Sequence, residues 1–114
     1  IHLFPITQLP NYLFQPSSVY AQQQKTPQQI QNERLLSLAR SYEQSGQFAR
    51  SLELYQRLWR DEPQNVVYYR GVKQNLTNLK QFDQALAAVR QMLATNPSPL
   101  VEADLGDAYY KLDY

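Results

Sequence analysis

The fold is decided by residues 35–48, which read LLSLARSYEQSGQF. Four apolar residues of this stretch recur at i, i+3, i+4 and i+7 and so share one helix face: Leu35, Leu38, Ala39 and Tyr42. Gly46 then supplies the permissive backbone on which a helix ends, and Phe48 begins a new apolar series at once. The stretch therefore predicts two amphipathic helices joined by a tight turn, which is an antiparallel helical hairpin.

The outer ends of this hairpin carry their own signals. Residues 26–29, which read TPQQ, form a capping box with proline at the first helical position. In it the Thr26 hydroxyl can accept from the Gln29 amide, while the Gln29 side chain reaches back. The second helix continues its apolar stripe through Leu52, Tyr55, Leu58 and Trp59. Residues 61–63 (DEP) are expected to end it, since proline cannot continue a helix.

The same arrangement recurs further along the chain. One helix is marked by Tyr69, Val72 and Leu76, and the next by Phe82, Ala85, Leu86, Val89 and Leu93. Pro97 closes this second pair as Pro63 closes the first, 34 residues earlier. Residues 98–99 (SP) open a fifth helix, whose apolar face consists of Leu105, Ala108, Tyr109 and Leu112. A fixed period with two helices in each unit predicts a solenoid of stacked hairpins rather than a closed bundle.

With these residues the chain resembles the tetratricopeptide repeat family, whose hairpins carry a loose pattern of Leu-Gly or Leu-Ala, Tyr, a turn Gly, aromatic residues and a final Pro. The first unit matches through Leu35, Leu38, Ala39, Tyr42, Gly46, Phe48, Tyr55 and Pro63. The second unit matches through Tyr69, Val72, Leu76, Phe82, Ala85 and Pro97. The third unit has only its first helix, where residues 105–111 read LGDAYYK. The resemblance implies an all-α, right-handed α-solenoid over residues 26–114, with units at about 32–65, 66–98 and 99–114.

Three residues depart from the family pattern. Ser51 stands where a small Ala is usual, Lys73 replaces a small residue of a first helix, and Lys80 replaces the turn glycine. A positive φ at Lys80 would cost about 1 kcal/mol. The second turn is therefore expected to differ from the first.

The first 25 residues have no sustained period and contain many Pro, Gln and aromatic residues, which predicts an irregular lead-in or linker. Small residues at Ser18 and Ala21 fit the end of a cleaved export signal loosely, although prolines interrupt any apolar core of such a signal. Two localisations stay open: the cytoplasm, or export to the periplasm if residues 1–21 are the end of a signal peptide. No stretch has the roughly 20 apolar residues of a membrane-spanning helix.

The composition argues against most kinds of chemistry. The 11 basic and 10 acidic residues leave a net charge of +1, whereas nucleic-acid binders usually have a clear basic excess. The chain has no Cys, and its one histidine, His2, lies in the lead-in, so neither a metal site nor a Ser-His pair is expected. Asp104 and Asp107 are explained by a solvated helix surface. We therefore expect no enzyme activity, no cofactor and no nucleic-acid partner.

The tyrosines divide into two groups. Those on the apolar stripes are expected to pack in the core: Tyr42, Tyr55, Tyr69 and Tyr109. Tyr68 and Tyr110 lie off the stripes and are expected to be free to contact a ligand. Residues 75–77 (NLT) fit a glycosylation acceptor, but they fall in mid-helix and are interpreted as a chance match.

The family resemblance places a partner-binding groove on first-helix residues that lie away from the core stripe. The residues so predicted are Glu33, Leu36, Arg40, Gln44, Arg70, Gln74, Thr77, Asn78, Leu100, Asp104, Asp107 and Lys111. This mixed lining suits an extended peptide or a partner helix, with Arg40 and Arg70 as the principal contacts. The chaperone-tail clamp of some family members is not predicted, because Gly71 stands where that clamp needs Asn.

The sequence thus predicts a non-catalytic scaffold that binds a protein or peptide partner. A repeat fragment of a larger, exported bacterial protein, in which it positions a separate catalytic or envelope-assembly domain, is the alternative. Self-association through the open C-terminal end also stays open, because a terminal unit normally needs a polar cap.

Overall fold

The computed structural model describes residues 24–113, and this part of the chain is helical with no strand. Its helices are α3 (Pro27–Gln44), α4 (Phe48–Asp61), α5 (Val66–Asn78), α6 (Phe82–Thr95) and α7 (Pro99–Leu112). The predicted all-α class is confirmed. The chain forms two compact units, Ile1–Gln31 and Asn32–Tyr114. Most of the predicted lead-in, with the export-signal remnant and His2, lies outside the described residues.

Helix α3 begins as the sequence predicts. The Thr26 hydroxyl accepts a hydrogen bond from the Gln29 amide at 3.1 Å, and the Thr26 amide donates to the Gln29 side chain at 2.8 Å. This is a complete capping box. Helix α7 likewise begins after a capping serine, because the Ser98 hydroxyl accepts from the Val101 amide at 3.3 Å and proline follows it. Both predicted starts are confirmed.

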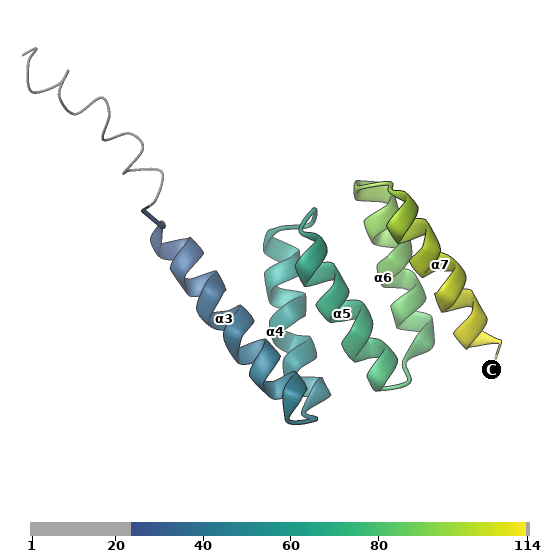
Figure 1. Ribbon diagram of the computed structural model, residues 1–114, viewed down its shortest axis with the longest axis horizontal. Coiled ribbons are helices and arrows are strands. Elements are labelled where there is room, and N and C mark those ends of the chain that lie inside the picture. Colours follow the sequence, from purple (N-terminus) through teal and green to yellow (C-terminus); the bar gives the residue numbers. More distant parts are fainter. Residues whose placement is uncertain (1–23, 114) are drawn as a thin grey trace, which may run out of the picture. The chain divides into compact units, whose positions relative to one another are not determined.

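From Asn32 onward, consecutive helices run antiparallel and pack against each other, with α3, α5 and α7 in one layer and α4 and α6 in the other (Figure 1). The core lies between the layers. Its largest fully buried side chains are Leu58, Tyr69, Val89, Met92 and Val101. Burial of such apolar side chains is the main contribution to stability, at roughly 25 cal/mol per Å².

The two turns that join the layers have the same backbone. Gly46 has φ 80° and Lys80 has φ 61°. Around Gly46, amide 46 donates to carbonyl 43 at 3.1 Å and amide 47 to carbonyl 42 at 2.8 Å; the corresponding bonds around Lys80 measure 2.9 and 2.8 Å. This is the Schellman pattern of a helix end. The expectation that the second turn would differ is wrong, because Lys80 adopts the left-handed conformation that glycine adopts in the first.

The apolar seam of α3 is shifted by one residue from the predicted stripe. Ala39 is fully buried, but Leu38 is 44% exposed, while Leu36 packs against the core. The reason is that the α3 contact with α4 runs along positions 32, 35, 36 and 39, and the Ala39 carbonyl itself accepts the Ser51 hydroxyl at 2.8 Å. The prediction of Leu38 as a core residue is therefore wrong.

Two tyrosine predictions are also wrong. Tyr68 is only 7% exposed, because α5 packs against both α4 and α6 and so buries adjacent positions of its sequence. Tyr109 is 45% exposed, and its ring lies against the Arg90 guanidinium, 5.4 Å from the ring centroid. Tyr55 and Tyr69 are buried and Tyr110 is 63% exposed, as predicted.

A buried polar chain joins α3, α4 and α5. The Asn75 side-chain amide donates to the Ser51 hydroxyl at 3.2 Å and to the Gly71 carbonyl at 2.8 Å. Ser51 in turn donates to the Ala39 carbonyl, so the departure at Ser51 has a structural use. Gly71 is also needed for packing, because a Cβ there would overlap the Tyr55 ring. Since Asn75 is fully buried, the glycosylation motif is not accessible in the folded chain.

Candidate functional site

The first part of the predicted groove lies on α3. Glu33, Leu36, Arg40 and Gln44 fall on one side of the helix and line a shallow depression of about 310 Å³, together with Ser37 and Ser41. Leu36 forms its apolar side and is partly buried, whereas the others are exposed at the surface. The α3 residues predicted from the sequence are therefore brought together.

Arg40 is tied to the core beneath this depression. Burial raises the pKa of the Tyr55 hydroxyl, and the nearby Glu43 carboxylate raises it further. The Arg40 guanidinium opposes this shift through its charge and a side-chain hydrogen bond to the same hydroxyl. The guanidinium is thus held over the α3–α4 hairpin and keeps further N–H donors for a ligand, because the fork carries five.

The second part lies on α5, where Arg70, Gln74 and Asn78 are exposed at i, i+4 and i+8. The Gln74 amide donates to the Asn78 side chain at 3.2 Å. Thr77 is partly buried, and its hydroxyl donates to the Lys73 carbonyl at 2.8 Å. This helix therefore presents a row of polar side chains, with Arg70 as its exposed cation.

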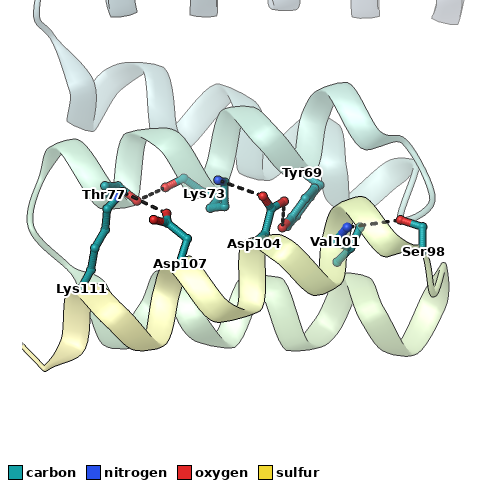
Figure 2. Close-up of polar contacts among 8 residues, drawn as sticks. All are labelled: Tyr69, Lys73, Thr77, Ser98, Val101, Asp104, Asp107 and Lys111. Atoms are coloured by element: carbon teal, nitrogen blue, oxygen red, sulfur yellow. Dashed lines mark hydrogen bonds and ion pairs between the residues drawn. The ribbon is translucent and has the colours of Figure 1, made fainter.

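The third part, on α7, is not a free surface throughout. Asp104 is directed at α5, where one carboxylate oxygen accepts the Tyr69 hydroxyl at 2.7 Å and the other lies 3.5 Å from the Lys73 ammonium (Figure 2). The exposed fractions of the Lys73 and Asp104 side chains are 17% and 14%. Asp104 therefore joins two helices, and the interpretation of Asp104 as a solvated surface residue or free groove contact is wrong.

The remaining α7 residues are more accessible. Asp107 and Lys111 form an i, i+4 ion pair of 3.1 Å, with 51% and 38% of the side chains exposed (Figure 2). Leu100 is 68% exposed. Such an exposed pair contributes little to stability, typically under about 1 kcal/mol, so a ligand could replace it at low cost.

Lys73 explains one departure from the family pattern. The pattern has a small residue at this position, and the structure places there a cation that pairs with Asp104, 31 positions further along the chain. Burial and the hydrogen bond to Asp104 raise the pKa of the Tyr69 hydroxyl well above its usual range. Tyr69 therefore stays protonated and remains a donor to the carboxylate.

Sequence reasoning missed a second polar cluster, centred on Glu62. Its carboxylate accepts from the Asn32 amide at 3.0 Å and from the Asn65 amide at 3.3 Å. Asn65 also caps α5, since its side chain accepts from the Val67 and Tyr68 amides. Burial, followed by the charges of Glu62 and Glu33, raises the pKa of the Tyr68 hydroxyl. The available signal was Asn32, a polar residue on an otherwise apolar seam.

The described residues offer surfaces for binding. Among residues 24–113 no group of three His, Cys, Asp or Glu side chains could hold a metal ion. None of the helices described is long and apolar enough to cross a membrane. What the face does present is a mixture of guanidinium, amide, carboxylate and apolar groups on α3, α5 and α7, which is the kind of lining that holds a peptide.

Compared with known proteins, the chain matches no protein-family model, and no curated protein matches it.

Proposed function

We propose that the chain is a tetratricopeptide-type scaffold, a right-handed α-solenoid that binds an extended peptide or a partner helix and catalyses no reaction. The observation that carries this proposal is the recurrence of backbone geometry at 34 residues. Helix α4 ends at Asp61 and α6 at Thr95, and α3, α5 and α7 end at Gln44, Asn78 and Leu112. The turn persists even where Lys80 replaces glycine. Repeated units of this kind form stacked hairpins.

The binding face of this proposal consists of exposed side chains on α3, α5 and α7: Glu33, Leu36, Arg40, Gln44, Arg70, Gln74, Asn78, Asp107 and Lys111. Arg40 and Arg70 are its main contacts, because a guanidinium fork pairs well with carboxylates and backbone carbonyls. Asp104 belongs to the support of this face, since it holds α7 against α5. The mechanism is equilibrium binding.

The test is affinity capture from the source organism's extract with the whole chain as bait. The informative variant is Arg40→Glu/Arg70→Glu, which reverses both proposed contacts. Its matched control is Arg34→Glu/Arg57→Glu, in which two exposed arginines outside the face undergo the same charge change. Circular dichroism of all three baits checks that the helices are retained.

We expect a partner that is retained by the wild type and the control and is lost from the Arg40/Arg70 variant. With the partner purified, the affinity should fall at least about tenfold in that variant, since reversing two contacts introduces repulsion as well as loss. Equal capture by all three baits would reject this face as the binding site.

A further inference from the structure

A second groove lies on the α4–α6 layer, away from the face described above. Its volume is about 430 Å³, and it runs between α4 and α6 with α5 beneath it. The lining residues are Gln56, Trp59, Arg60, Val72, Leu76, Gln84, Ala87, Ala88 and Gln91. No part of this surface belongs to the binding face proposed above, so the two surfaces can be tested separately.

The hollow arises from the small residues of α6. Ala87 and Ala88 are adjacent on the flank of α6 that faces α4, where larger side chains would fill the space. Beneath them the floor is apolar and already buried: Trp59, Val72 and Leu76 are 6%, 2% and 2% exposed. A groove of this depth can therefore take an apolar side chain without rearrangement of the core.

The rim of the groove is polar and uncommitted. Within residues 24–113, the side chains of Gln56, Arg60, Gln84 and Gln91 are exposed and make no hydrogen bond or ion pair with the protein. On the opposite layer, by contrast, Gln74 bonds to Asn78 and Asp107 pairs with Lys111. Unpaired amides around an apolar floor are the arrangement of a site that supplies orientation and specificity to a ligand.

The charge of the lining indicates the ligand. Arg60 is the one charged side chain among the nine lining residues, and no acid is among them. We propose that this groove binds an extended peptide segment that carries an acidic side chain next to an apolar one. The carboxylate pairs with Arg60, and the apolar side chain lies over Ala87 and Ala88.

The glutamine rim favours an extended peptide over a helix. A helix satisfies its own backbone groups, whereas an extended segment presents free N–H and C=O groups along both edges. Each glutamine amide can donate to a carbonyl and accept from an N–H. Gln84 and Gln91 on α6, with Gln56 on α4, therefore offer backbone contacts on both sides of the groove.

The test begins with selection of a random octapeptide phage library on the whole chain. Enriched peptides are then synthesised with a fluorescent label, and their affinity is measured by anisotropy at low and raised salt. Arg60→Gln removes the cation, and Arg57→Gln is its matched control on the same helix, outside the lining. Ala87→Phe fills the groove, and Ala94→Phe, an exposed position of α6 outside the lining, is the control for that change.

We expect an enriched motif with an acid adjacent to an apolar residue. Its affinity should fall about two- to fivefold in Arg60→Gln, with a weaker salt dependence, because an exposed pair contributes up to about 1 kcal/mol. It should fall at least about tenfold in Ala87→Phe, which blocks the apolar contact. Arg57→Gln, Ala94→Phe and Arg40→Glu/Arg70→Glu should bind as the wild type does.

Any of four results would overturn the proposal: no enrichment, a motif without an acid, an apolar helical i, i+3, i+4 motif, or peptides insensitive to Ala87→Phe. A concentration-dependent dimer that Ala87→Phe abolishes would assign the groove to a second copy of the chain instead. Peptides sensitive only to Arg40→Glu/Arg70→Glu would support the proposed function and reject this groove.

Discussion

Lys80 occupies a position at which the backbone conformation favours glycine. Its φ of 61° lies in the left-handed region, and the turn around it has the same hydrogen bonds as the turn around Gly46. A left-handed conformation costs an ordinary L-residue roughly 1–2 kcal/mol, because Cβ approaches the following carbonyl oxygen. The turn is nevertheless retained, which means that the packing of α5 against α6 determines it.

Lys80→Gly is therefore expected to stabilise the chain. The gain should be about 0.5–1 kcal/mol, because the relief of strain is offset in part by the greater entropy of glycine in the unfolded chain. The reciprocal change, Gly46→Ala, should destabilise by about 1 kcal/mol, since a Cβ at Gly46 meets nothing within 4 Å and only the backbone opposes it. Urea unfolding followed by circular dichroism measures both. A destabilising Lys80→Gly would contradict this account.

At the scale of elements, α7 is held to the layer of first helices by one polar contact. Asp104 on α7 bonds to Tyr69 and pairs with Lys73, both on α5 (Figure 2). The Asp107–Lys111 pair on the same helix lies within α7 and is more exposed. The two aspartates are three residues apart in sequence, yet only the first connects two elements.

Asp104→Ala should therefore destabilise the chain by about 1.5–3 kcal/mol, because a charge-assisted hydrogen bond is lost and Lys73 is left without its partner. Asp107→Ala is the matched control, with an expected cost of at most about 0.5 kcal/mol. Hydrogen exchange gives the local readout: amides of α7 should exchange faster in Asp104→Ala than in Asp107→Ala. Equal effects of the two substitutions would mean that the Asp104 contact does not hold α7.

The elements themselves could be predicted from local sequence signals. The TPQQ box, Ser98-Pro99, Gly46 and the two 34-spaced prolines act within a few residues of their positions, so the helix ends follow from them. The phase of a helix about its axis is a tertiary property. Leu38 and Leu36 differ little in apolar character, and only the contact with α4 decides that Leu36 packs against the core while Leu38 is exposed.

The candidate site was less predictable for the same reason. Arg40, Arg70 and Gln74 could be assigned to the surface from their helix positions, and they are exposed. The role of Asp104 depends on Tyr69 and Lys73, which are more than 30 residues earlier in the chain. No periodicity links them. The α4–α6 groove could not be predicted either, because it depends on the two short side chains of Ala87 and Ala88 facing another helix.

At the scale of the whole molecule, three hydroxyls buried within the helical layers couple stability to pH. The pKa values of Tyr55, Tyr68 and Tyr69 are all raised, with burial as the largest cause in each case. The unfolded chain releases these protons near pH 10, whereas the folded chain keeps them to higher pH. Their contribution to stability is therefore fully present below about pH 10 and is lost as the pH rises beyond it.

Tyr69→Phe tests this coupling at the hydroxyl with the largest shift. The free energy of unfolding of the wild type should fall between pH 9 and 11, with a slope of up to about 1.4 kcal/mol per pH unit for each tyrosine that titrates only when unfolded. Tyr69→Phe should be less stable by about 1 kcal/mol at pH 7, because the bond to Asp104 is lost, but its further loss by pH 11 should be smaller. Val89→Ala is the control, since it lowers stability through the core and keeps all three tyrosines. If Tyr69→Phe loses as much stability between pH 9 and 11 as Val89→Ala does, Tyr69 is not part of the coupling.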